Sequence, residues 1–145
     1  MKASLLYRIA AVLLLLFAVA HIMGFGQSDP SWGVDGLLTL MRSKHFDVQG
    51  SSRSYWDFFV AAGITVGVFY AFTAVLAWQL GGLRHDALAA MRITAWALVL
   101  CFAGITLLSW RHLFLAPIVS SAVITACLAA AAIAIDRPGS SRRAA

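Results

Sequence analysis

Four apolar segments, each close to the length of a membrane span, take up most of the 145-residue chain. They cover residues 5–25, 55–80, 93–110 and about 116–135. A helix rises about 1.5 Å per residue, so roughly 20 apolar residues cross the ~30 Å hydrocarbon core of a bilayer. Hydrophobic residues make up 61% of the sequence, which excludes a soluble globular domain, where the share is roughly 45–50%. Because a span must satisfy its backbone hydrogen bonds internally, we predict an all-α integral membrane four-helix bundle that occupies residues 1–145 as a single domain.

The basic residues predict the orientation of this bundle. If the N-terminus is cytoplasmic, seven of the eleven Lys and Arg residues lie on the inner side and four on the outer side. The inner ones are Lys2, Arg8, Arg84, Arg92, Arg137, Arg142 and Arg143, and the outer ones are Arg42, Lys44, Arg53 and Arg111. Such a bias follows the positive-inside rule. We therefore predict a multi-pass protein of the bacterial inner (plasma) membrane with both termini cytoplasmic, and the net charge of +5 requires no nucleic-acid partner.

The N-terminal segment has a second interpretation. Its leucine-rich stretch ends in Ala18-Val19-Ala20, which has the form of a signal-peptide cleavage site. The apolar run continues beyond this point to Phe25. We therefore expect the first span to be retained.

Local signals mark where the later spans begin and end. The glycine pair Gly81-Gly82 is suited to ending the second helix. The third helix is expected to start early, with Asp86 near its N-terminus, where the helix dipole favours an anion. Pro117 fits the first turn of the fourth helix.

The connection between the first two spans, residues 26–54, is the one long outer loop. Within it Val34, Leu37, Leu38 and Met41 recur at i, i+3, i+4 and i+7, which predicts a short amphipathic helix. This helix is expected to lie on the membrane surface or to fold over the bundle as a lid. A turn is predicted at residues 49–52, and residues 136–145 form a polar tail that is predicted to be disordered.

Small residues indicate where helices meet. Gly63 and Gly67 form a G-x-x-x-G in the second span, and residues 129–132 of the fourth are all alanine. Such positions let two helix backbones approach closely in lipid. We expect these contacts within one bundle, and contacts between subunits are the alternative.

Asp57 is the chemically most informative residue, because it lies three residues into the second span. A carboxylate at membrane depth is costly and usually has a partner. His21, Arg111 and His112 are expected to reach the same outer face of the bundle. If helices one and two are neighbours, His21 and Asp57 come within direct or one-water reach and form a proton-transfer pair.

Each of these residues also has a structural interpretation. Asp57 suits the positive end of a helix dipole, His21 could make a bond between helices, and Arg111 could reach the lipid headgroups. Several aromatic residues fit a belt at the membrane interface. They are Trp32, Tyr55, Trp56 and Trp110.

No metal or other cofactor is expected. No two histidines are spaced to bind a metal from one helix, and His21, His45 and His112 lie in separate segments. Cys101 and Cys127 fall in the middle of spans three and four, where a small apolar packing role is expected.

Two motifs carry a resemblance to known proteins. The stretch from Arg8 to Leu13 and on through Ala20 to Phe25 resembles the first helix of small four-helix bacterial inner-membrane proteins of the DoxX-like kind. The Tyr-Trp-Asp-Phe sequence at residues 55–58 is similar to the start of the second helix in uncharacterised membrane proteins. The resemblance implies a four-span fold with one long outer loop, and it supplies no catalytic residues.

Three hypotheses for function follow. The first is a small membrane protein that binds an apolar or lipid-like ligand at the outer leaflet, or assists a partner membrane protein. The alternatives are a membrane enzyme that uses His21 and Asp57 for proton transfer on a lipophilic substrate, and a purely structural assembly subunit. Expected partners are membrane lipids, a lipophilic small molecule, and a partner membrane protein or a second copy. The predicted ligand-binding residues are Trp32, His21, Tyr55, Trp56, Asp57, Arg111 and His112.

Overall fold

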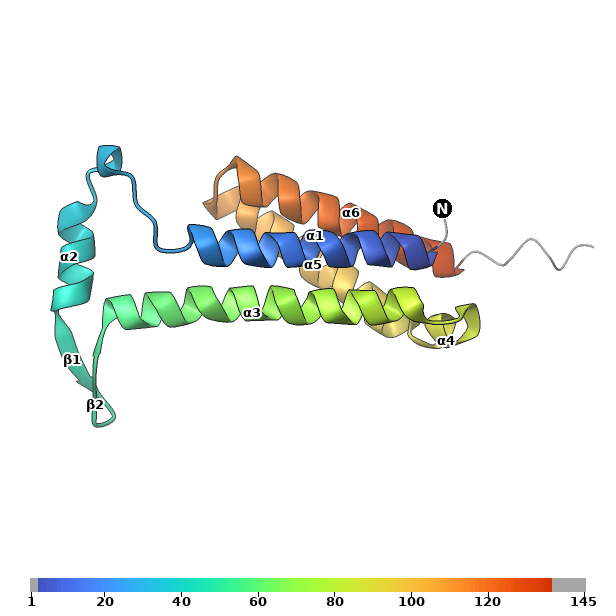
Figure 1. Cartoon of the computed structure of the whole chain (residues 1–145), viewed down its shortest axis with the longest axis horizontal. Helices are drawn as coiled ribbons and strands as arrows, with labels where there is room; N and C mark the ends of the chain where they lie inside the picture. The colour runs from blue at the N-terminus through green and yellow to red at the C-terminus, as the bar shows by residue number, and fades with distance from the viewer. Residues whose placement is uncertain (1–2, 137–145) are drawn as a thin grey trace, which may run out of the picture. The chain divides into compact units, whose positions relative to one another are not determined.

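The structure is a computed structural model that describes residues 3–136. Its elements, in chain order, are α1 (Ala3–Gly24), the 3-10 helix η1 (Pro30–Trp32), α2 (Asp35–Ser43), β1 (His45–Val48), β2 (Ser51–Ser54), α3 (Tyr55–Gly82), α4 (His85–Ala90), α5 (Arg92–His112) and α6 (Leu115–Asp136) (Figure 1). The described chain is mostly helical. The basic residues Lys2, Arg137, Arg142 and Arg143, and the predicted tail beyond Asp136, lie outside the described residues.

Four helices, α1, α3, α5 and α6, are long and apolar enough to cross a membrane. Each end of these helices lies within two residues of the position predicted for a span, and the membrane crossing itself stays a prediction. The glycine pair Gly81-Gly82 ends α3, and Pro117 lies in the first turn of α6, where its missing N–H is tolerated.

The chain divides into two compact units. Unit 2 is Ala18–Tyr70, and unit 1 comprises residues 1–17 and 71–145, of which 3–17 and 71–136 are described. The boundaries between the units fall inside α1 and inside α3. Each of these two helices therefore contributes one part to each unit.

In unit 1, α5 and α6 pack along each other (Figure 1), and two hydroxyl side chains meet in their contact. Thr106 Oγ1 lies 3.1 Å from Thr125 Oγ1 across this contact. Each hydroxyl also lies within hydrogen-bond distance of a carbonyl oxygen of its own helix, Thr106 at 2.8 Å from that of Phe102 and Thr125 at 2.7 Å from that of Ser121. Hydroxyl groups that bond to the preceding turn need no water, which suits helices in lipid.

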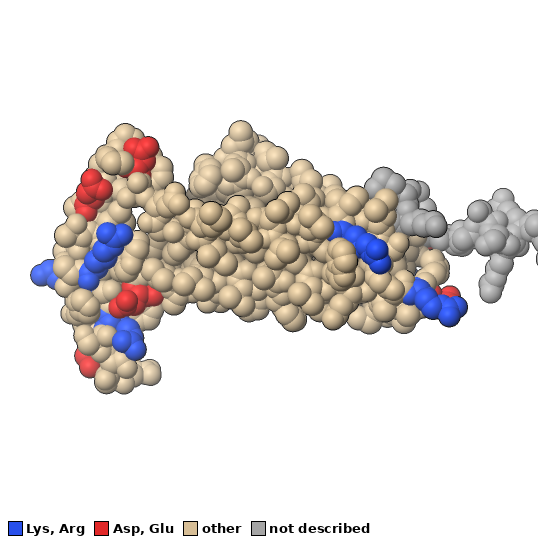
Figure 2. Space-filling model, in the orientation of Figure 1, with Lys and Arg blue, Asp and Glu red and all other residues tan. Residues whose placement is uncertain are grey.

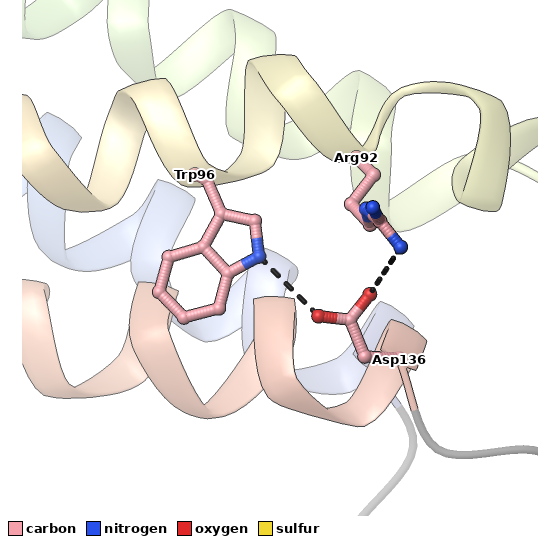
Figure 3. Close-up of polar contacts among 3 residues, drawn as sticks. All are labelled: Arg92, Trp96 and Asp136. Carbon is pink, nitrogen blue, oxygen red and sulfur yellow. Dashed lines mark hydrogen bonds and ion pairs between the residues drawn. The ribbon is translucent and has the colours of Figure 1, made fainter.

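The ends of α5 and α6 are joined by a polar contact of three residues (Figure 3). Asp136, at the C-terminal end of α6, accepts a hydrogen bond from Trp96 Nε1 at 3.4 Å and lies 3.6 Å from Arg92 Nη1. An acid at a helix C-terminus is unfavourable to the dipole, and the Arg92 charge offsets that cost.

The helix that forms the third predicted span of the chain starts differently from the prediction. A continuous helix from Asp86 is expected from the sequence, whereas α4 ends at Ala90 and α5 begins at Arg92. Met91, between them, has φ −90° and ψ 17°, so the chain breaks there without a glycine or a proline. That break carries no sequence signal of the kind that glycine or proline supplies.

In unit 2, the predicted amphipathic helix is confirmed as α2 (Figure 1). The structure adds an antiparallel hairpin where the sequence predicts a turn alone, and in it β1 pairs with β2 in the register Val48 opposite Ser51. Its two turn residues, Gln49 and Gly50, have φ of 52° and 81°, the positive values that tight hairpin turns require. The Asp47 carboxylate accepts the Gly50 N–H at 3.0 Å and holds the turn.

Candidate functional site

The candidate site is the part of unit 2 where the end of α1, the connection 25–54 and the start of α3 contact one another. His21, in the last turn of α1, is half-buried. Its Nε2 lies 3.0 Å from the carbonyl oxygen of Gly63 on α3. Because a carbonyl only accepts, Nε2 carries the proton, and in a neutral ring Nδ1 is then a hydrogen-bond acceptor. The ring also lies edge-on to Tyr70, with centroids 6.1 Å apart.

The predicted G-x-x-x-G on α3 makes this contact possible. A Cβ at Gly63 would overlap the Phe25 ring, and a Cβ at Gly67 would lie 2.6 Å from Ile22 Cγ1. The two glycines therefore allow the end of α1 to approach α3 closely enough for the His21 bond. The expectation that these glycines serve packing within the chain is confirmed.

Asp57 caps α3 rather than facing His21. Its Oδ2 accepts hydrogen bonds from the Ser54 N–H at 2.8 Å and the Ser54 hydroxyl at 3.0 Å. In return, the Asp57 N–H donates to Ser54 Oγ at 3.3 Å. This reciprocal arrangement is a capping box, and it places the carboxylate at the positive end of the helix dipole.

The structure does not bring Asp57 and His21 together as predicted. His21 bonds to Gly63, six residues beyond Asp57 and thus about 9 Å further along α3. The reason is that Ser54 supplies the carboxylate's hydrogen bonds locally, whereas the histidine reaches a backbone carbonyl exposed by a glycine. The direct or one-water pair expected from the sequence is therefore replaced by two separate contacts.

Aromatic side chains form two clusters at the first turns of α3. In the first cluster, Phe59 stacks on Phe25 with centroids 4.6 Å apart and lies 5.5 Å from Trp56. The Arg42 guanidinium of α2 lies 4.0 Å from the Trp56 ring centroid, a cation–π contact. These contacts tie α2 to the start of α3.

In the second cluster, Phe46 of β1 lies 5.0 Å from Tyr55 and 6.1 Å from Phe58, measured between ring centroids. Tyr55 and Phe58 are 64% and 48% exposed. Residues three apart on a helix share a face, so Tyr55 and Phe58 present one continuous aromatic surface, with Phe46 packed against it. The charged side chains of unit 2 gather on residues 29–57, from the N-cap of η1 to the first turn of α3, while the parts of α1 and α3 in this unit are otherwise uncharged (Figure 2).

Three further residues are predicted for the site, Trp32, Arg111 and His112. Trp32 is an exposed residue of η1, whose N-cap Asp29 accepts the Ser31 N–H at 2.8 Å. Side-chain and backbone hydrogen bonds from Ser31 hold the pKa of Asp29 below its ordinary value. Arg111 and His112 are exposed at the C-terminal end of α5 in unit 1, so their convergence with the residues of unit 2 stays a prediction.

Several residues of this site are missing from the set predicted from the sequence. Ser54 carries a signal that identifies it, because Ser-x-x-Asp before an apolar helix is a capping-box pattern. Arg42 and Phe46 carry no such signal, since a cation–π contact and a ring contact between distant segments depend on the folded loop.

No family model, curated protein or solved structure matches this chain. The resemblance to DoxX-like proteins therefore stays a prediction. Within residues 3–136, no group of three His, Cys, Asp or Glu residues is placed to hold a metal ion.

Proposed function

We propose that this chain is a small membrane protein that binds an apolar or lipid-like molecule through unit 2, at the outer leaflet. The observation that carries the proposal is the exposed aromatic surface of Tyr55 and Phe58, backed by Phe46. Large exposed apolar surfaces on a membrane-boundary segment suit contact with lipid or with an apolar ligand.

The setting of this function is also a proposal. We place α1, α3, α5 and α6 in one bundle in a bacterial inner membrane, with both termini cytoplasmic and the loop 26–54 outside. The bias of the basic residues supports the orientation, and the apolar length of the four helices supports the number of crossings.

The test is to purify the protein in its native lipid and identify what it retains. We expect a lipophilic compound, enriched over bulk lipid, that is lost from the double variant Tyr55→Ala/Phe58→Ala. Phe72→Ala is the matched control, because Phe72 is an exposed aromatic residue of the same helix outside unit 2. Equal retention by both variants, or no enrichment in the wild type, contradicts the proposal.

A second candidate is a purely structural assembly subunit, for which the polar contacts supply a specific observation. Asp57 and His21 both have partners that belong to the fold, Ser54 and the Gly63 carbonyl. If the same purification yields no enriched compound but a stable complex with another membrane protein, this candidate is favoured. The contacts do not favour a proton-transfer enzyme, because the two groups it needs have separate partners.

A further inference from the structure

Unit 1 carries an apolar groove between the N-terminal part of α1 and the C-terminal part of α3. The buried alanines Ala11 and Ala74 form its base, and the exposed side chains of Leu15 and Trp78 border it. Its volume is about 240 Å³. This is smaller than the roughly 300–1,000 Å³ of drug-sized ligand sites, so the groove suits a segment of a flexible chain better than a ring system.

A second groove, of about 300 Å³, adjoins the first at Val12 and Trp78. Arg8 is the charged residue of its lining, which otherwise consists of apolar side chains. The Arg8 guanidinium carbon lies 5.3 Å from the Trp78 ring centroid. The two grooves thus form an apolar path with a cation at one end.

Arg8 lies within a candidate membrane span and has no ion-pair partner among the residues that the structure describes. It is five residues from the start of α1, about 7.5 Å along the helix axis. An arginine at this depth is stabilised by reaching the phosphate layer or by an anion that comes to it.

Within the candidate spans, a second copy of this chain offers no carboxylate without a partner. The candidate spans contain two carboxylates, Asp57 and Asp136. Asp57 is bound by Ser54, and Asp136 by Arg92 and Trp96. An occupant that matches Arg8 therefore brings its own negative charge together with a long apolar part.

We propose that unit 1 binds one anionic phospholipid, whose phosphate contacts Arg8 and whose acyl chain passes Trp78 into the alanine-based groove. Arginine favours phosphate because its planar guanidinium donates two parallel hydrogen bonds. This site is separate from the aromatic surface of unit 2. Its test does not depend on the function proposed for that surface.

The test uses the full chain in detergent, titrated with phosphatidylglycerol or phosphatidylcholine of equal chain length and followed by native mass spectrometry. We expect the wild type to retain one phosphatidylglycerol in preference to phosphatidylcholine. Arg8→Gln should lower that preference about fivefold, the factor that one basic residue contributes near an anionic surface. Arg8→Lys should keep only part of the preference, because it keeps the charge but loses the two parallel hydrogen bonds of the guanidinium.

Two further variants distinguish this lipid site from a general effect of surface charge and from a contact between two copies of the chain. Arg84→Gln removes an exposed arginine that lines neither groove and should bind as the wild type does. Ala71→Leu adds bulk to the lining of the first groove and should weaken retention of both lipids, with the helix content by circular dichroism unchanged. Equal retention of the two lipids by the wild type, an unchanged preference in Arg8→Gln, or a dimer that Ala71→Leu dissociates would overturn the proposal, the last in favour of a second copy.

Discussion

At the scale of single residues, the role of the Asp57 carboxylate follows from its hydrogen-bond partner, Ser54. A carboxylate in an apolar helix suggests a functional site when only its depth is considered. The structure shows that Ser54 donates two hydrogen bonds to it and that the α3 dipole favours its position. Asp57 therefore fixes the point where the hairpin ends and α3 begins, since Ser54 is also the last residue of β2.

This arrangement predicts the outcome of a double-mutant cycle. Ser54→Ala should lower the free energy of unfolding by about 1 kcal/mol, the typical cost of a lost N-cap. The double variant Ser54→Ala/Asp57→Ala should lose less unfolding free energy than the sum of the two single variants, because each single change already breaks the same capping box. The measurement is the free energy of unfolding in bicelles by steric trapping.

The control for that cycle pairs His21→Ala with Asp57→Ala. These two changes should add within roughly 0.3–0.5 kcal/mol, because the residues have separate partners. A coupling above about 1 kcal/mol between His21 and Asp57 would show that they act as a pair and would contradict their separate contacts with Gly63 and Ser54.

At the scale of elements, the sequence predicts the helices well and the hairpin poorly. Length and apolar composition locate α1 and α3 because a span must be both long and uncharged. The strands β1 and β2 are four residues each, and the second, Ser-Ser-Arg-Ser, lacks the β-branched and aromatic residues that mark strands. Pairing with β1 and the Gln49-Gly50 turn, rather than strand propensity, accounts for β2.

The contact between α1 and α3 in unit 2 gives a prediction at this scale. Gly63→Ala should destabilise the protein by about 1–3 kcal/mol, the cost of overpacking, because the added methyl group overlaps the Phe25 ring. Gly104→Ala on α5 is the matched control. Apart from the adjoining backbone of α5, no atom of the described residues lies within 4 Å of its added methyl group, and alanine is the better helix former, so the change should be neutral or stabilising.

Thermal unfolding in the same detergent compares the two glycine variants. The chemical shift of the His21 ring provides a second measurement, because Gly63→Ala should disturb its bond to the Gly63 carbonyl whereas Gly104→Ala should leave it unchanged. Equal stability of both variants would mean that Phe25 moves aside without cost, and the close contact would then not limit packing.

At the scale of the whole molecule, the sequence predicts the number of spans and leaves their mutual packing open. Helices that are apolar on all sides, as α3 is, carry no amphipathic stripe to show which face meets a neighbour. In lipid the burial of apolar surface does not select a face either, because lipid tails are as apolar as leucine. The small residues Gly63 and Gly67 on α3, and the buried Ala131 and Ala132 of the alanine run on α6, are the part of the helix-contact pattern that could be read in advance.

The number of spans predicts on which side of the membrane two points of the chain lie. Residue 50 follows one candidate span and the C-terminus follows four, so the two points must lie on opposite sides of the membrane if all four helices cross it. Alkaline phosphatase fused after residue 50 should be active, and green fluorescent protein fused at the C-terminus should fluoresce, because the basic residues favour the inner side at both termini. A phosphatase fusion in the connection at residue 84, after two spans, is the control and should be inactive. Reporters at residue 50 and at the C-terminus on the same side would refute four crossings, whereas opposite sides in the reverse sense would refute only the orientation.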